Sequence, residues 1–217
     1  MEIQRTANAG VLLRLDGVSI LLDGLCDRVE GYLPTPEHIV EQLLASPPDL
    51  LAFTHKHPDH CSQALLLPYT QNKLRPILGP ASLPTQKMQV GEVTVTAVET
   101  RHLGKTEPGL VHMSFVIEGS KTIWFMGDAS PISLKKMEQF PKPDVLIAPY
   151  AYANTPSAWA QTIAVSPKMV IILHLPEKEQ DVYGLRQQVE ETAGAFQGLW
   201  LPKIGEEKPY NILDNPI

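Results

Sequence analysis

The sequence predicts an α/β fold in which short apolar strands alternate with amphipathic helices. Apolar or alternating runs of about four to eight residues, bounded by Gly, Pro, Asp or Ser, recur along the chain and are typical of strands. Segments with helical spacing separate several of these runs. With 43% hydrophobic and 19% charged residues, the 217-residue chain has the composition of a globular protein, so we expect residues 1–217 to form a single domain.

The expected elements of the N-terminal half begin with a hairpin. Asp16-Gly17 separates two apolar runs, and Asp-Gly supplies the positive φ angles of a tight type I′ turn. Thr35 is expected to cap a helix whose first turn begins with Pro36. In chain order we expect strands over residues 11–15 and 18–22, a helix over 38–44, a strand over 49–54, a helix over 62–69 and a strand over 75–80.

The C-terminal half is expected to continue the alternation. Gly119-Ser120 marks the turn of a second hairpin, and Val182, Leu185 and Val189 follow helical spacing in the last amphipathic segment. In chain order we expect a strand over residues 93–100, a hairpin over 113–126, a helix over 134–140, a strand over 144–148, a helix over 157–164, a strand over 168–173 and a helix over 181–196.

The charge and the N-terminus narrow the classes of function. A formal charge of −6 argues against a broad basic face that holds nucleic acid or an anionic membrane. The N-terminus lacks the pattern of a secretory signal, and no apolar run approaches the ~18 residues of a membrane span. We therefore expect a cytoplasmic protein in which Cys26 and Cys61 are reduced and buried.

Four apolar strands run directly into a residue that can bind a metal ion. These residues are His55, His102, Asp128 and His174. Ligands at strand ends are held by a rigid sheet, while the loops beyond leave room for a substrate. The pattern predicts that the four strand ends meet at one site.

The first of these strand ends carries a dense cluster of ligands. Three of the seven histidines, His55, His57 and His60, fall within six positions together with Asp59. Imidazole and carboxylate suit Zn²⁺ and related cations, whereas a closed structural zinc site would be rich in thiolates. Five histidines and two aspartates exceed what one catalytic ion needs, so the sequence predicts two metal ions.

The stretch His55–His60, followed by His102, Gly127-Asp128 and His174, resembles the metallo-β-lactamase superfamily over almost the whole chain. The resemblance implies a four-layer αββα sandwich with a dinuclear metal centre along one edge. Carried over by position, His55, His57 and His102 would hold the first metal ion, Asp59, His60 and His174 the second, and Asp128 would bridge them. Asp23 matches the aspartate that supports the ligands from behind, although an aspartate before glycine is also ordinary turn chemistry.

The resemblance also implies a reaction and its cofactors. The expected function is that of a metal-dependent hydrolase similar to the small ascorbate-6-phosphate lactonase-like group. Two divalent ions, Zn²⁺ with Mn²⁺ or Fe as alternatives, would present a bound hydroxide to a small ester, lactone or phosphodiester. Asp59 would orient that hydroxide or accept its proton, and His174 would position the substrate's oxygen.

Two other functions stay open from the sequence. One is a nuclease or cyclic-nucleotide phosphodiesterase, which uses the same metals but needs cations around its groove. The other is a non-catalytic metal- or ligand-binding protein of the same fold, because a fold does not fix a function. A small-molecule substrate is the expected partner, nucleic acid and membrane are not, and the sequence does not define the oligomeric state.

Further residues near the expected ligands are candidates for substrate contacts, with an ordinary surface role equally open. Cations there would bind an anionic group of the substrate, and tyrosines in a loop would line the pocket. His112 precedes a strand and either faces the site or caps a sheet edge, so we leave it outside the metal set. The candidates for substrate contacts are Lys56, Arg101, Lys105, Tyr150 and Tyr152.

Overall fold

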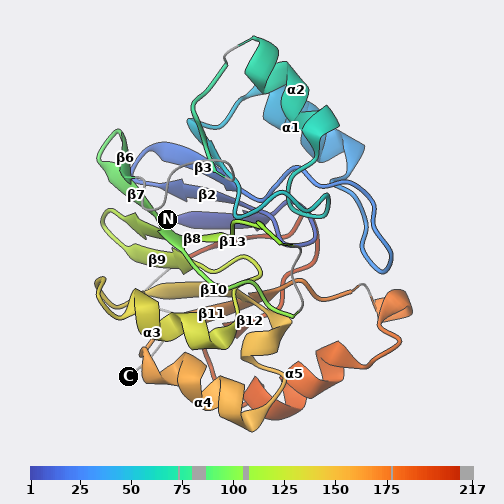
Figure 1. The fold of residues 1–217 in the computed structure, drawn as a ribbon, viewed down its shortest axis with the longest axis vertical. Coiled ribbons are helices and arrows are strands. Elements are labelled where there is room, and N and C mark those ends of the chain that lie inside the picture. Colours follow the sequence, from blue (N-terminus) through green and yellow to red (C-terminus); the bar gives the residue numbers. More distant parts are fainter. Residues whose placement is uncertain (73, 80–86, 105–107, 177, 211–217) are drawn as a thin grey trace.

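The computed structural model describes residues 1–72, 74–79, 87–104, 108–176 and 178–210. Two β-sheets pack face to face, with α1 and α2 outside the first sheet and α3, α4 and α5 outside the second (Figure 1). This arrangement confirms the expected αββα sandwich. The α-helices are α1 (Glu37–Ala45), α2 (Gln63–Gln71), α3 (Leu134–Met137), α4 (Pro156–Ala164) and α5 (Leu185–Ala193).

Among the described residues, the first sheet contains six strands in the order β13-β1-β2-β3-β4-β5. The strands from β13 to β3 pair antiparallel, whereas β3, β4 and β5 pair parallel. Because β4 lies between β3 and β5, its end lies inside the sheet and not at the margin. The strands are β1 (Glu2–Arg5), β2 (Val11–Leu15), β3 (Val18–Leu22), β4 (Leu50–Ala52), β5 (Ile77–Leu78) and β13 (Glu207–Pro209).

In the part of the chain that the structure describes, the second sheet contains seven strands in the order β12-β11-β10-β9-β8-β7-β6. The strands from β6 to β9 pair antiparallel, and those from β9 to β12 pair parallel. The strands are β6 (Lys87–Val90), β7 (Val93–Glu99), β8 (Met113–Glu118), β9 (Thr122–Phe125), β10 (Val145–Pro149), β11 (Met169–Leu173) and β12 (Leu199–Trp200).

Three apolar layers hold the sandwich together. In β10, Val145 and Ile147 face the layer between the two sheets, while Leu146 and Ala148 face the layer under the helices. A parallel strand that is buried on both faces reads as a continuous apolar run, which is why this strand was evident from the sequence. A third layer lies between the first sheet and α1 and α2. Within the described part of the chain, no helix has both the length and the apolar character that a membrane crossing needs.

Most of the expected turns and elements are present. Asp16 and Gly17 have φ angles of 50° and 80°, which confirms the tight turn of the first hairpin. The second hairpin joins β8 to β9 through Gly119-Ser120. Cys26 and Cys61 are both buried and unpaired, as expected.

The expected start of α1 is wrong by one residue. Pro36, not Thr35, occupies the N-cap position, and no side chain caps the helix. The Thr35 hydroxyl instead accepts a hydrogen bond from the Cys26 amide at 2.8 Å and donates one to the Gly24 carbonyl at 3.1 Å. These contacts close the loop that leads from β3 to α1, so Thr35 stabilises a loop rather than a helix end.

The expected start of the last helix is also wrong. α5 begins at Leu185, because the Asp181 side chain accepts hydrogen bonds from the amides of Leu185 and Arg186 and holds the chain in a turn before the helix. Val182 is 80% exposed and does not belong to the apolar face of the helix. Four short strands, β1, β6, β12 and β13, were not expected from the sequence. They are two to four residues long, too short for a periodic signal.

Candidate metal centre

The structure brings all seven expected ligands into three overlapping groups at one edge of the sandwich. In each group, the ligand atoms lie within 4.8 Å of one another. His55 and His60 each belong to two of the groups, so the three groups form one continuous cluster. The groups are His55, His57 and His102; His55, His60 and Asp128; and Asp59, His60 and His174.

The first group consists of three imidazoles whose ring nitrogens face one another. His55 Nε2 lies 2.9 Å from His57 Nδ1 and 3.3 Å from His102 Nε2. Three ligands at 2.0–2.1 Å around a tetrahedral cation would be about 3.3 Å apart. The spacing therefore fits a metal ion, and three imidazoles leave a fourth position free for another ligand.

The other two groups combine imidazoles with carboxylates. His174 Nε2 lies 3.1 Å from Asp59 Oδ2 and 3.3 Å from Asp128 Oδ2, and His60 Nε2 is also 3.3 Å from Asp128 Oδ2. His102 Nε2, from the first group, lies 3.8 Å from the same Asp128 oxygen. Asp128 thus lies between the first group and the third, as a bridging carboxylate would.

Two buried polar atoms of the cluster support the presence of a cation. His60 Nε2 and Asp128 Oδ1 are buried, and neither has a hydrogen-bond partner among the residues that the structure describes. A buried polar atom without a partner costs about 1–3 kcal/mol. A bound cation would satisfy both atoms, so the donor set fits divalent metal ions.

Asp23 supports the cluster from behind. Its carboxylate accepts hydrogen bonds from the Thr54 amide at 2.7 Å, the Thr54 hydroxyl at 2.6 Å and His60 Nδ1 at 2.8 Å, and its side chain is fully buried. Because the Thr54 hydroxyl donates to Asp23, it accepts from His55 Nδ1, at 2.9 Å. These contacts fix the Nε2 lone pairs of His55 and His60 toward the cluster, the support that a metal-bound imidazole needs.

Burial and charge set the protonation of the ligands. Burial lowers the pKa of both His55 and His57 and keeps these imidazoles neutral. Burial also opposes a charge on His60, but Asp128 and Asp23 outweigh it and raise the pKa of His60 to about 10. The Asp128 carboxyl has a pKa well below its usual range, because His174 and His60 outweigh the effect of burial. Without a bound cation, protonated His60 and His174 would supply the positive charge beside the carboxylates.

Asn8 contacts the centre, although nothing in the sequence pointed to it. Its side-chain amide donates to Asp59 Oδ2 at 3.4 Å, and its backbone carbonyl accepts from the His174 amide at 3.3 Å. The buried Arg5 guanidinium donates to the same carbonyl at 3.0 Å. Asn8 follows β1, a strand that the sequence analysis did not predict, and no local pattern marks it.

His112 also lies at the centre, outside the expected ligand set. Only 2% of the residue is exposed, its ring centroid is 5.0 Å from that of His55, and burial lowers its pKa to about 3. It belongs to none of the ligand groups formed by the described residues. A signal was present in the sequence, because the start of an antiparallel strand lies at the same edge of the sheet as the ends of its neighbours.

The open side of the cluster is lined by partly exposed ligands and two tyrosines. The side chains of His102 and His174 are 10% exposed, and those of Asp59 and Asp128 are 14% exposed. The Tyr32 ring packs edge-on against the His174 ring at 4.5 Å, and the Tyr150 ring lies 6.4 Å from it. Tyr32 was not among the candidates from the sequence, whereas Tyr150 was.

The other candidates for substrate contacts differ in their placement. Lys56 and Arg101 are exposed residues that adjoin the ligands His55 and His102. Tyr152 is fully buried and donates its hydroxyl to the Ser130 carbonyl at 3.2 Å, so it packs in the core and does not line a pocket. Lys105 lies outside the described residues.

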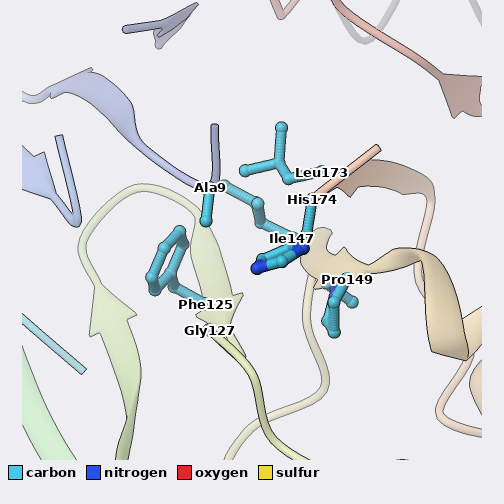
Figure 2. Close-up of a pocket in the computed structure, with 8 residues that line it drawn as sticks. Ala9, Phe125, Gly127, Ile147, Pro149, Leu173 and His174 are labelled. Atoms are coloured by element: carbon cyan, nitrogen blue, oxygen red, sulfur yellow. The ribbon is translucent and has the colours of Figure 1, made fainter. Parts of the chain in front are cut away.

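The inner side of His174 is closed by packing. Figure 2 shows His174 with Ala9, Phe125 and Ile147 around a cavity between the two sheets. The cavity holds about 10 Å³, at the lower limit for a single water molecule. A substrate therefore reaches the cluster from the partly exposed side and not through the core.

Comparisons with known proteins agree with this fold and site. A family model described as the beta-lactamase superfamily domain matches residues 2–174. A UPF0173 metal-dependent hydrolase from Polynucleobacter asymbioticus is 32% identical over 197 residues, which covers 73% of this chain and 68% of that protein. Its name gives the enzyme class that was expected from the sequence.

Two solved structures share the fold at low sequence identity. A possible metal-dependent hydrolase from Veillonella parvula has a TM-score of 0.71 and 13% identity, over 96% of this chain and 98% of that chain. Igni18, a metallo hydrolase from Ignicoccus hospitalis, has a TM-score of 0.65 and 17% identity, over 97% of this chain and 99% of that chain. The family model carries the assignment, and the chain belongs to the beta-lactamase superfamily.

Proposed function

We propose that this metal-dependent hydrolase cleaves a small ester, lactone or phosphodiester at a centre of two divalent metal ions, with Zn²⁺ as the first candidate. The observation that carries the proposal is the set of three overlapping ligand groups that share His55 and His60. A single catalytic ion uses three protein ligands, so seven ligands in one cluster support two ions.

The distances support an assignment of the ligands to two metal positions. His55, His57 and His102 would hold one ion, Asp59, His60 and His174 the other, and Asp128 lies within reach of both groups. When bound, a pair of divalent cations lowers the pKa of water toward neutrality and stabilises negative charge that develops on a substrate oxygen. Hydrolysis is the reaction that this chemistry supports.

Asp59 is the residue we assign to proton transfer. Its Oδ2 atom is held by His174 Nε2 and the Asn8 amide, and its side chain stays partly exposed at the open side. A carboxylate that is fixed in this way can accept a proton from an attacking water and return it to the leaving group. His174, in contact with Asp59 and flanked by Tyr32, would orient the substrate's oxygen.

The surroundings of the centre favour a small substrate over a nucleic acid. The formal charge is −6, and Lys56 and Arg101 are the exposed cations that directly adjoin ligands within the described residues. A polymer of phosphates is held by many cationic contacts. Two cations suffice for one carboxylate or phosphate group, so an anionic group on the substrate is compatible with the site.

Metal content is the first test of the proposal. Protein purified without a histidine tag is analysed for metals per chain, in parallel with His55→Ala and Asp128→Ala. We expect about two ions per chain in the parent and fewer in both variants, because His55 belongs to two of the ligand groups and Asp128 lies within reach of both proposed metal positions. A parent that takes up no Zn²⁺, Mn²⁺ or Fe²⁺ would overturn the proposal and favour a non-catalytic role.

Hydrolysis is the second test. The metal-loaded parent is assayed on a lactone panel, p-nitrophenyl acetate and bis(p-nitrophenyl) phosphate, with Asp59→Asn as the variant. Loss of a proton-transfer group is expected to lower kcat by about 10²–10⁴-fold. Metal content of the variant is measured in the same samples, to separate loss of proton transfer from loss of an ion. Phosphodiester turnover well above lactone turnover would favour the phosphodiesterase alternative.

A further inference from the structure

His112 reaches the metal centre from the start of a strand. It directly precedes β8, which runs antiparallel to both β7 and β9. The start of β8 therefore lies at the edge where β7 and β9 end, beside His102 and Asp128. The ring centroid of His112 is 5.4 Å from that of His102.

Both ring nitrogens of His112 are engaged by the protein. The backbone amide of Asp128 donates to His112 Nε2 at 3.1 Å. Because Nε2 accepts, the neutral ring carries its hydrogen on Nδ1 and donates to the Thr100 hydroxyl at 2.9 Å. The Thr100 amide also donates to the His112 carbonyl at 3.0 Å. The ring is thus fixed in orientation and in tautomer, and neither nitrogen is available to a metal ion.

The hydrogen bonds continue from Thr100 and return to the same turn. The Thr100 hydroxyl donates to the Ser114 hydroxyl at 2.9 Å, and the Ser114 hydroxyl donates to the Met126 carbonyl at 3.0 Å. Met126 and Asp128 flank Gly127, whose φ of 54° lies in the left-handed region. The chain from His112 to Ser114 therefore holds this turn at both of its ends.

We propose that His112 is a positioning residue that fixes the Gly127-Asp128 turn, so that the Asp128 carboxylate lies between the two metal positions. The inference rests on the proposed function, since it assigns a role relative to the proposed metal ions. Removal of a hydrogen-bond partner of a metal ligand commonly lowers metal affinity by about 10–100-fold. His112 contributes by hydrogen bonding to the Asp128 amide and not by coordination.

The test measures Zn²⁺ affinity rather than turnover. The parent, His112→Leu and His112→Gln are stripped of metal and titrated with Zn²⁺ against a chromophoric chelator, with thermal unfolding of each metal-free protein as a record of folding. We expect Zn²⁺ affinity to fall about 10–100-fold in His112→Leu. His112→Gln should recover most of it, because its amide oxygen can accept the Asp128 N–H.

Two further variants provide a milder change and a control. Thr100→Val breaks the hydrogen-bond chain but leaves His112 in place, so we expect a smaller loss of affinity; this variant replaces His112→Leu if the latter fails to fold. His38→Leu removes an exposed histidine from α1 and should leave Zn²⁺ affinity unchanged.

The possible outcomes separate the inference from the proposed function. A Zn²⁺ affinity equal to the parent's in folded His112→Leu would overturn the role of His112 and leave the proposed dinuclear centre intact. Where His112→Leu does not fold, a Zn²⁺ affinity equal to the parent's in Thr100→Val would have the same meaning. Equal losses in His112→Leu and His112→Gln would overturn the hydrogen-bond explanation. A parent protein that binds no Zn²⁺ would overturn the proposed function itself.

Discussion

The two halves of the sandwich supply residues to the candidate metal centre in different ways. The first half provides His55, His57, Asp59 and His60 from one short loop after β4. The second half provides one ligand from each of three strand ends, His102 after β7, Asp128 after β9 and His174 after β11. One half depends on the conformation of a loop, and the other depends on the alignment of separate strands.

This difference extends to the residues that hold the ligands. In the first half, Asp23 accepts hydrogen bonds from Thr54 and His60. Thr54 in turn accepts a hydrogen bond from His55, so the loop is fixed from behind. In the second half, the Asp128 turn is held by His112, which directly precedes another strand, β8. The Met113 amide donates to the Thr54 carbonyl at 2.8 Å and joins the two systems. Each half is thus fixed by its own hydrogen bonds, and a backbone hydrogen bond connects the two halves.

The largest effect is expected from removing the support of the first half. Asp23→Ala would leave the Thr54 amide and His60 Nδ1 buried without partners, and should lower the free energy of unfolding by about 3–5 kcal/mol. Zn²⁺ affinity should fall as well, because His55 and His60 both lose their fixed orientation. Urea unfolding of the metal-free protein and chelator competition measure the two effects.

Asp49 offers a matched control in the same sheet. Its carboxylate accepts hydrogen bonds from the amide and the hydroxyl of Ser19, both at 2.9 Å, away from the ligands. Asp49→Ala should lower stability and leave Zn²⁺ affinity unchanged. If Asp23→Ala behaved in the same way, the first half would not need its supporting carboxylate to form the metal site.

The same contrast explains what the sequence could predict. The loop after β4 is visible as a local motif, and the apolar strands before His102, Asp128 and His174 are long enough to mark their ends. Asn8 could not be found from the sequence, and two placements stayed open for His112, because their contacts join residues 51 and 16 positions apart and depend on strand register. Thr35 and Val182 were misplaced because loop contacts and the Asp181 turn override helical patterns.

A smaller effect is expected from disturbing the turn of the second half. At Gly127, a Cβ would lie 2.5 Å from Thr54 Cγ2, in addition to the strain of the positive φ angle. Gly127→Ala should therefore lower the free energy of unfolding by about 2–4 kcal/mol and weaken Zn²⁺ binding by displacing Asp128. Gly205→Ala is the matched control, because Gly205 has a φ of 84° and nothing within 4 Å of an added Cβ.

The comparison of these two glycines separates strain from displacement. Gly205→Ala should show the cost of the backbone conformation, about 1 kcal/mol, with parent Zn²⁺ affinity. Zn²⁺ affinity equal to the parent's in Gly127→Ala would mean that metal binding tolerates a shift of Asp128, contrary to its proposed role between the two metal positions.

The smallest effect is expected at the edge of the second sheet that lies away from the ligands. Asp144 accepts hydrogen bonds from the Thr122 amide at 3.0 Å and from Lys168 at 2.7 Å, where β9, β10 and β11 begin. Burial would raise the pKa of Asp144, but these hydrogen bonds outweigh it and lower the pKa below 3.8. The stabilisation is therefore complete above pH 3.8 and is lost as the pH falls through the lowered pKa.

Asp144→Asn tests whether a change in strand alignment at this distant edge affects the positions of the ligands. The free energy of unfolding of the metal-free protein should fall by about 0.5–1 kcal/mol at pH 7, and the difference from the parent should shrink near pH 3, as urea unfolding at both values would show. Zn²⁺ affinity at pH 7 should stay unchanged, because His112 and Met113 hold the ligand edge independently of the strand starts. A parallel loss of affinity would mean that strand register, and not the local hydrogen bonds, sets the position of Asp128.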